Sequence, residues 1–176
     1  MHGVVSLLDD KYYVEVEQLW AELAEKFGVC GIYAVPYPHF SYQVVEDYDL
    51  ERLELILTKV ARFNRPFRVI TTGLGIFTGL RPVLYIPVVR NSELTEFHQR
   101  IWDEISQAAI NPSDYYHPSR WMPHITVADL DLNHQTLGQI ASMLSKRSFM
   151  WELTIDNLAL IYDTGRGVEL RMRFEL

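Results

Sequence analysis

The stretch "WMPHITVADL", residues 121–130, has a counterpart earlier in the chain in "PYPHFSYQVV", residues 36–45. Each stretch places a proline, a histidine, an apolar residue, a hydroxyl residue and a second apolar residue in the same order. Both are rich in the aromatic and β-branched residues that favour strands. The sequence therefore predicts two strands of one pattern, each beginning directly after a proline.

Strand geometry turns this repeat into a prediction about side-chain direction. In a strand, residues i and i+2 point to the same face of the sheet. His39 and Ser41 therefore share one face, and His124 and Thr126 share a face in the same way. Burial of the apolar residues between them would direct these four polar side chains into a cleft.

Two other histidines also match the bare pattern H-x-[ST], but their contexts differ. His117 is followed by a proline in a segment expected to be a loop, where no strand geometry aligns the side chains. His134 lies in the expected first turn of a helix, where a spacing of two does not align side chains. We therefore predict no site at His117 or His134.

Around the two motifs the chain repeats one order of elements. We expect strands at residues 3–8, 39–45, 67–77, 83–89, 124–130, 151–163 and 168–176, and a loop at 111–123. Helical spacing of apolar residues predicts four helices, the first ended by Gly28 with Trp20 in the core, and the others opened by Asp49, Ser92 and Asn133.

The order strand, helix, Pro-His strand, helix, strand thus occurs twice. This predicts an α+β fold of two similar lobes, with antiparallel sheets facing a central cleft and helices on the outer faces. Residues 1–176 are expected to form a single bilobal domain.

Composition limits the environment and the partners. The chain of 176 residues is 48% hydrophobic, carries a net charge of −7 and contains a single cysteine, Cys30. An unpaired cysteine fits a reducing cytoplasm, and the sequence has neither a secretory leader pattern nor an apolar run that could span a membrane. Since it also has no basic stripe, we expect no tight binding to long nucleic acid. These features leave the oligomeric state open.

The paired motifs suit metal-free phosphoryl transfer. The sequence contains no HExxH and no CxxC, and two histidines with hydroxyl neighbours lack the third ligand that zinc normally takes. We therefore expect no metal and no cofactor. One imidazole can take a proton from the attacking oxygen while the other delivers one to the leaving oxygen. Hydroxyl groups at Ser41 and Thr126 can hold the non-bridging phosphoryl oxygens.

These features together resemble the two-histidine (2H) phosphoesterase superfamily, in particular its 2'-5' RNA ligase-like and cyclic phosphodiesterase branch. The resemblance rests on "PHFSY", "PHITV" and the intervening "PFRVITTGLGIF…PVLYIPV", and it extends over essentially the whole chain. It implies a bilobal fold and HxTx-type catalytic residues at His39, Ser41, His124 and Thr126. Members open 2',3'-cyclic phosphates or similar diesters, and some join or cleave 2'-5' linkages.

The chain departs from this pattern in one place. Ligase-like relatives often follow the second motif with a basic residue, whereas this sequence has Asp129. Together with the acidic net charge, this argues against tRNA ligation. Tyr115, Tyr116 and Arg120, on the loop before the second motif, could stack on a base and contact a phosphate.

The expected substrate is therefore a nucleotide or a short RNA end, with a cyclic phosphodiester or a 2'-5' linkage as the bond acted on. Two alternatives remain open at the level of sequence. One is a nucleotide-binding module of the same fold without significant turnover. The other is an enzyme that acts on a cyclic phosphate outside RNA, on a sugar or a small metabolite.

Overall fold

A computed structural model describes residues 2–176 of the chain. The strands are β1 (His2–Leu7), β2 (His39–Tyr48), β3 (Phe67–Ile70), β4 (Gly75–Phe77), β5 (Val83–Pro87), β6 (Ala109–Pro112), β7 (His124–Ala128), β8 (Glu152–Ile155), β9 (Asn157–Asp163) and β10 (Val168–Glu175). The helices are α1 (Asp10–Phe27), α2 (Leu50–Arg62), α3 (Ser92–Ile105) and α4 (His134–Leu144), with short 3-10 turns η1 (Gly31–Ala34) and η2 (Asp114–Tyr116). None of these helices combines the length and apolar character needed to cross a bilayer.

The strands form two groups that are antiparallel throughout. One is a five-stranded sheet in the order β10-β9-β1-β2-β6. The other contains β4-β5-β7 and the pair β3-β8, which meet at an antiparallel bridge between Thr71 and Val88. The two motif strands, β2 and β7, belong to different groups and contact each other. The predicted α+β fold with antiparallel sheets is confirmed.

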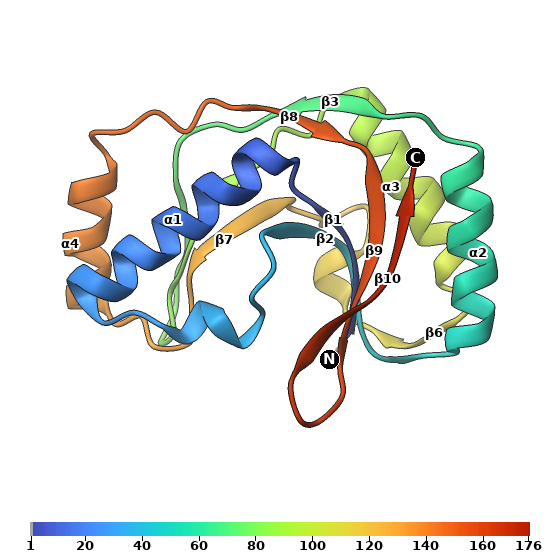
Figure 1. Ribbon diagram of the computed structural model, residues 1–176, viewed down its shortest axis with the longest axis horizontal. Coiled ribbons are helices and arrows are strands. Elements are labelled where there is room, and N and C mark those ends of the chain that lie inside the picture. The colour runs from blue at the N-terminus through green and yellow to red at the C-terminus, as the bar shows by residue number, and fades with distance from the viewer. Residues whose placement is uncertain (1) are drawn as a thin grey trace.

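Helices flank the sheets at opposite ends of the molecule (Figure 1). α2 and α3 pack against each other and against strands of the five-stranded sheet, whereas α1 packs against β7 and α4. The helix that follows β1 therefore covers the other sheet, and the helix that follows β5 covers the five-stranded sheet. The two lobes exchange helices and are not consecutive halves of the chain.

Alternating burial along the motif strands sets the direction of the polar side chains. On β2, Phe40 and Tyr42 are fully buried, and on β7 the same is true of Ile125 and Val127. The histidines and hydroxyl residues between them are half-buried. A single hydrophobic cluster joins the apolar faces of both sheets with residues of α1, α2, α3 and α4. The predicted alternation of faces is confirmed on both strands.

Most helix ends follow the predicted capping chemistry. The side chains of Asp49 and Asn133 accept backbone N–H groups in the first turns of α2 and α4. Gly28 ends α1 with φ of 68°, a left-handed conformation that costs glycine little. Trp20 is buried, as predicted, at 3% exposure.

The predicted cap of the third helix is wrong by one residue. Asn91 caps α3, because its side-chain oxygen accepts the backbone N–H of Leu94 at 2.8 Å. Ser92 is the first residue inside the helix. Asn and Ser are about equally good caps, so the choice depends on which residue has extended backbone geometry, and Asn91 has it with ψ of 173°.

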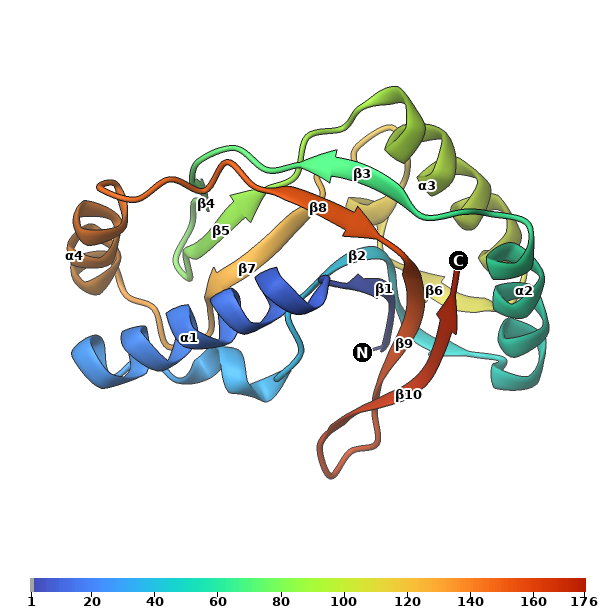
Figure 2. The same cartoon turned by 45° about the horizontal axis from the view of Figure 1, so that its top comes forward.

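Two predicted strands and one predicted loop need correction. Residues 67–77 divide into β3 and β4 around a turn at Gly73, whose φ is 55°, because β3 pairs with β8 while β4 pairs with β5. Residues 151–163 divide at Asp156, where the chain passes from β8 in one group to β9 in the five-stranded sheet (Figure 2). Residues 111–123, expected as a loop, begin with the end of β6 and contain η2.

Candidate active site

The four motif residues line one cavity of about 290 Å³ between the sheets. His39 and Ser41 come to it from β2, and His124 and Thr126 from β7. Its remaining wall comes mainly from η1, β1 and the residues that follow β7, with single residues from β2, β9 and η2. Two segments far apart in the sequence thus present an imidazole and a hydroxyl each to the same space.

Both imidazoles are held by the same kind of hydrogen bond. The Nδ1 of His39 bonds to the carbonyl of Tyr37, and the Nδ1 of His124 bonds to the carbonyl of Met122 at 2.7 Å. Because a carbonyl only accepts, each Nδ1 carries the hydrogen. The Nε2 atom of each ring is therefore the one that can exchange a proton with a ligand.

Prolines explain why both rings adopt this arrangement. Pro38 and Pro123 stand between each histidine and the carbonyl that it contacts. A proline favours extended backbone in the residue before it, which places the same restraint on the carbonyls of Tyr37 and Met122. Each of these carbonyls accepts the Nδ1–H of the following histidine and thereby selects its tautomer.

The two histidines differ in their electrostatic surroundings. Burial lowers the pKa of His39 to about 4, against a smaller raising effect of the Tyr37 carbonyl, and the charge of His124 lowers it further. Burial also lowers the pKa of His124, but the Met122 carbonyl and the carboxylate of Asp129 act in the opposite direction. The rings are close enough to affect each other, and only His124 has a carboxylate among the groups that affect it.

Two tryptophans hold the backbone at the hydroxyl residues. The indole Nε1–H of Trp121 donates to the carbonyl of Ser41 at 2.8 Å. The indole of Trp20, on α1, donates to the carbonyl of Thr126 at 3.1 Å. Sequence reasoning treated Trp20 as core only and gave Trp121 no role. The sequence offered one indication for Trp121, because it lies three residues before His124. Its hydrogen-bond partner on β2 could not be predicted, because that contact depends on how the two sheets pack.

A buried histidine that sequence reasoning also missed lies behind β2. His98 on α3 is fully buried, and its Nε2–H donates to the carbonyl of Tyr42 at 2.9 Å. Its ring stacks on Trp121 with centroids 3.7 Å apart. Burial lowers the pKa of His98 to about 4, which favours the neutral ring. Two aromatic donors on adjacent carbonyls thus fix the strand that carries His39.

A second cavity of about 680 Å³ adjoins the first and contains the residues expected to bind substrate. Tyr115, Tyr116 and Arg120 line it together with aromatic and apolar residues, among them Phe77. Tyr115 is 79% exposed at its rim. Burial raises the pKa of Tyr116, and the side chain of Ser41 acts against this shift. Tyr116 also borders the first cavity, so it links the predicted binding residues to the motif residues.

The sequence profile of the 2'-5' RNA ligase superfamily matches residues 9–167. This chain belongs to that superfamily. Among curated proteins, one named "Putative phosphoesterase" from Bacillus mycoides is 25% identical over 138 residues, which is 77% of this chain and 76% of that protein. A protein of the same name from Bacillus cereus is 25% identical over 142 residues, with the same coverage of both chains. The predicted resemblance to two-histidine phosphoesterases is confirmed.

Solved structures of other proteins share the fold of this chain. TT0787 of Thermus thermophilus superposes with a TM-score of 0.67 at 16% identity, covering 99% of this chain and 97% of TT0787. Escherichia coli LigT, solved in complex with 3'-AMP, gives a TM-score of 0.60 at 14% identity, again covering 99% and 97%. At these identities the likeness concerns the fold.

The two histidines at which the sequence predicted no site, His117 and His134, lie outside both cavities. His117 is exposed, and its Nδ1 lies 2.8 Å from the hydroxyl of Ser119. His134 is exposed at the first position of α4. Within residues 2–176, no group of three or more His, Cys, Asp and Glu side chains is arranged to hold a metal ion.

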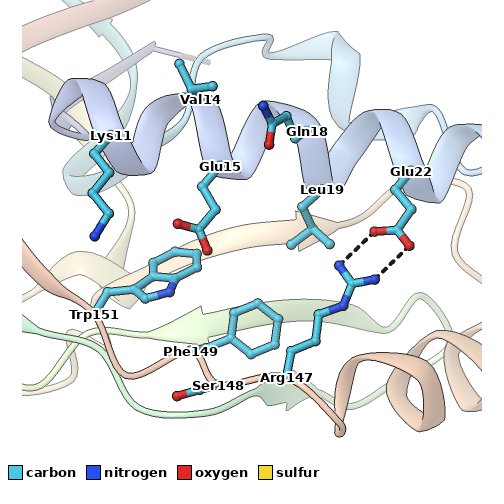
Figure 3. Close-up of a pocket in the computed structure, with 10 residues that line it drawn as sticks. All are labelled: Lys11, Val14, Glu15, Gln18, Leu19, Glu22, Arg147, Ser148, Phe149 and Trp151. Atoms are coloured by element: carbon cyan, nitrogen blue, oxygen red, sulfur yellow. Dashed lines mark hydrogen bonds and ion pairs between the residues drawn. The ribbon is translucent and has the colours of Figure 1, made fainter.

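A separate hollow of about 450 Å³ lies between α1 and residues 147–151 (Figure 3). Arg147 spans it and forms two hydrogen bonds of 2.7 Å with Glu22 on α1. This ion pair lowers the pKa of Glu22 to about 2. The hollow has no imidazole among its lining residues, and its arginine is already neutralised by Glu22, so it does not resemble the pair of imidazoles between β2 and β7.

Proposed function

We propose that this chain is a metal-independent phosphoesterase that hydrolyses a cyclic phosphodiester on a nucleotide or a short RNA end. The observation that carries the proposal is the matched pair of Nδ1–carbonyl bonds at His39 and His124, which leaves both Nε2 atoms free in one cavity. An acid and a base of this kind are what the opening of a cyclic diester requires.

The two imidazoles take different roles in this proposal. The Nε2 of neutral His39 accepts a proton from water, whose oxygen attacks phosphorus. The bond from phosphorus to one ring oxygen then breaks, and His124 donates its Nε2 proton to that oxygen. The product is a phosphate monoester and a free hydroxyl. The hydroxyls of Ser41 and Thr126 hydrogen-bond the non-bridging oxygens.

Electrostatics support this assignment of roles. A base must be neutral, and burial holds the pKa of His39 at about 4. An acid must be protonated, and although burial lowers the pKa of His124, the Met122 carbonyl and the carboxylate of Asp129 favour its charged form. A bound phosphate adds negative charge to the cavity and raises the pKa of both rings. The ring with the carboxylate neighbour is the one expected to gain the proton.

The second cavity supports a nucleoside as the organic part of the substrate. Aromatic side chains at Tyr115 and Tyr116 offer faces on which a base can stack, and Arg120 can contact a phosphate oxygen. The complex of E. coli LigT with 3'-AMP gives a precedent within the same fold. With a net charge of −7, the chain should use short ends as readily as polymers.

We also propose that residues 1–176 act as a single bilobal domain in the cytoplasm. One hydrophobic cluster extends through both sheets and all four α-helices of the described residues, which favours one folding unit. Cys30 is exposed and unpaired, and an exposed thiol persists in a reducing compartment.

The proposal is tested by assaying the purified chain in excess EDTA on 2',3'-cyclic nucleotides, 2'-5' dinucleotides and ADP-ribose cyclic phosphate. We expect hydrolysis of the cyclic nucleotides and weaker or no action on the dinucleotides. Binding without turnover would favour the alternative of a nucleotide-binding module. Activity that EDTA abolishes and one divalent ion restores would overturn the metal-independent mechanism.

A further inference from the structure

A strained turn follows directly after β7. The N–H of Asp131 donates to the carbonyl of Asp129 at 2.8 Å, and Leu130 between them has φ of 62°. A hydrogen bond from residue i+2 to residue i around a positive φ defines a γ-turn that is rare and strained. Leucine has no glycine-like freedom in this region, and Leu130 is 56% exposed, so its burial does not explain the conformation.

Contacts from another part of the chain hold this turn in place. The carboxylate of Asp131 accepts the backbone N–H groups of Cys30 at 2.7 Å and of Gly31 at 2.9 Å. Gly31 packs so closely that a Cβ there would lie 2.5 Å from the carbonyl oxygen of Asp129. Strain that is held by several independent contacts is typical of functional sites.

The result of this arrangement is the position of the Asp129 side chain. Asp129 lines both cavities, at the place where His124, Thr126 and Tyr116 also border both. Among the described residues that line the two cavities, Asp129 supplies the one carboxylate and Arg120 the one guanidinium or ammonium group. With the protonated His124 of the proposed mechanism, the cleft has two positive charges and, at Asp129, one negative charge, which leaves positive charge for about one phosphate.

We propose that Asp129 is a specificity-determining residue that restricts the cleft to substrates whose single phosphate is the cyclic one that reacts. This inference rests on the proposed function and makes it narrower: the preferred substrate is a nucleoside 2',3'-cyclic phosphate and not an RNA end. A second phosphate would enter a partly desolvated cleft beside a carboxylate, where Asp129 and the reacting phosphate already offset the charges of Arg120 and His124. Like charges repel more strongly in a cleft that partly excludes water than they do in bulk water.

The Oδ1 of Asp129 accepts the backbone N–H of Leu130 at 2.6 Å. The test compares the wild type with Asp129→Asn, which removes the charge but keeps an oxygen for this hydrogen bond. The control is Glu96→Gln, which makes the same charge change at an exposed position of α3. The probes are adenosine 3'-monophosphate and adenosine 3',5'-bisphosphate, with Kd measured by calorimetry at low and high salt. In parallel, kcat/KM is measured for adenosine 2',3'-cyclic phosphate with and without a 5'-phosphate.

We expect the wild type to prefer the probes with one phosphate, and Asp129→Asn to reduce this preference by at least ~5-fold, mainly through gain on the second phosphate. The preference should shrink at high salt, because screening weakens the repulsion. Glu96→Gln should keep the wild-type ratio. An unchanged ratio in Asp129→Asn, an equal change in Glu96→Gln, or no binding of either nucleotide would each overturn the inference.

The two readouts separate this inference from the proposed function. If no cyclic phosphate is hydrolysed but the ratio of Kd values changes in Asp129→Asn, the hydrolytic function fails and the role of Asp129 stands. If hydrolysis occurs and both ratios are unchanged, the function stands and the role of Asp129 is wrong.

Discussion

The half-site on β2 and the half-site on β7 are built in the same way and differ in charge. In each, a proline precedes a histidine whose Nδ1 bonds to the carbonyl two residues back. In each, an indole N–H holds the carbonyl of the hydroxyl residue, Ser41 or Thr126. Only the β7 half-site has a carboxylate, that of Asp129, among the groups that raise the pKa of its histidine.

This comparison shows that the repeated motif accounts for the geometry of the two half-sites but not for their difference in charge. Repetition of the Pro-His strand gives two equivalent geometries, with each Nε2 free to exchange a proton. Hydrolysis of a diester needs two different protonation states, one ring neutral and one charged. Part of that difference comes from a residue outside the repeat, because the carboxylate of Asp129 acts on His124 and no carboxylate acts on His39. That part can be changed without altering the motifs.

Removal of either imidazole should have the largest effect. We predict that His39→Ala and His124→Ala each lower kcat for a 2',3'-cyclic nucleotide by at least ~10², because each proton transfer is typically worth that much or more. Thermal unfolding should change little, since both side chains are only half-buried and face the cavity. Initial rates in EDTA and melting curves measure the two quantities.

His117→Ala and His134→Ala serve as controls for these variants. Both histidines match the same short pattern, but they are exposed and lie outside the cavities. Their kcat should stay close to that of the wild type. A loss at either position equal to that of the motif variants would show that the pairing of β2 with β7 is not the active arrangement.

The hydroxyl residues should come next in size. Ser41→Ala and Thr126→Ala each remove one hydrogen bond to a charged phosphoryl oxygen, worth roughly 1.5–3 kcal/mol, so kcat/KM should fall on the order of 10- to 100-fold. Thr126→Ser keeps the hydroxyl and should retain most of the activity. If Thr126→Ser were as inactive as Thr126→Ala, the methyl group and not the hydroxyl would be the important part.

The tryptophan donors should have a smaller effect that is equal in the two half-sites. Trp20→Phe and Trp121→Phe keep an aromatic ring but lose one hydrogen bond to a motif carbonyl, worth about 1 kcal/mol, so kcat should fall ~5-fold with little change in KM. Trp151→Phe is the matched control, because Trp151 is buried beside the separate hollow and away from the motifs. A fall of the same size in Trp151→Phe would indicate a general loss of packing.

The smallest effect should appear in the pH dependence. If His39 is the base, kcat/KM rises through a pKa of about 4, and it falls again as His124 loses its proton. Burial lowers the pKa of His124, and the carboxylate of Asp129 opposes this shift. Asp129→Asn should therefore lower that pKa further and move the descending limb to lower pH, by less than ~1 unit. The ascending limb should not move. If Asp129→Asn moved only the ascending limb, His124 would be the base and His39 the acid.

The sequence predicted the parts of this site that depend on local pattern. Period-two alternation identified His39, Ser41, His124 and Thr126 as facing residues, and capping chemistry identified Gly28, Asp49 and Asn133 as helix ends. The choice between neighbouring caps, Asn91 and Ser92, depends on a backbone angle that either residue could adopt. The structure places Tyr115, Tyr116 and Arg120 beside the motif residues, and their contact with substrate stays a prediction.

The features that the sequence did not predict depend on contacts between distant segments. The exchange of helices between the lobes, and the passage from β8 to β9 at Asp156, follow from which sheet each strand joins, and local periodicity does not contain that information. The same holds for His98 and Trp121, whose partners lie on β2. The direction of Asp129 depends on a turn that its own sequence does not favour, and on Gly31 in a distant part of the chain.

The central claim is that two half-sites of equal geometry and unequal charge act on one phosphate. The most direct measurement is a titration of the side-chain ¹⁵N signals of His39 and His124 by NMR, without ligand and with adenosine 3'-monophosphate. We predict that Nδ1 carries the proton in both neutral rings, that His39 titrates at lower pH than His124, and that the nucleotide shifts both Nε2 signals together. The claim would be contradicted if the nucleotide affected only one ring, or if His124 gave up its proton at a lower pH than His39.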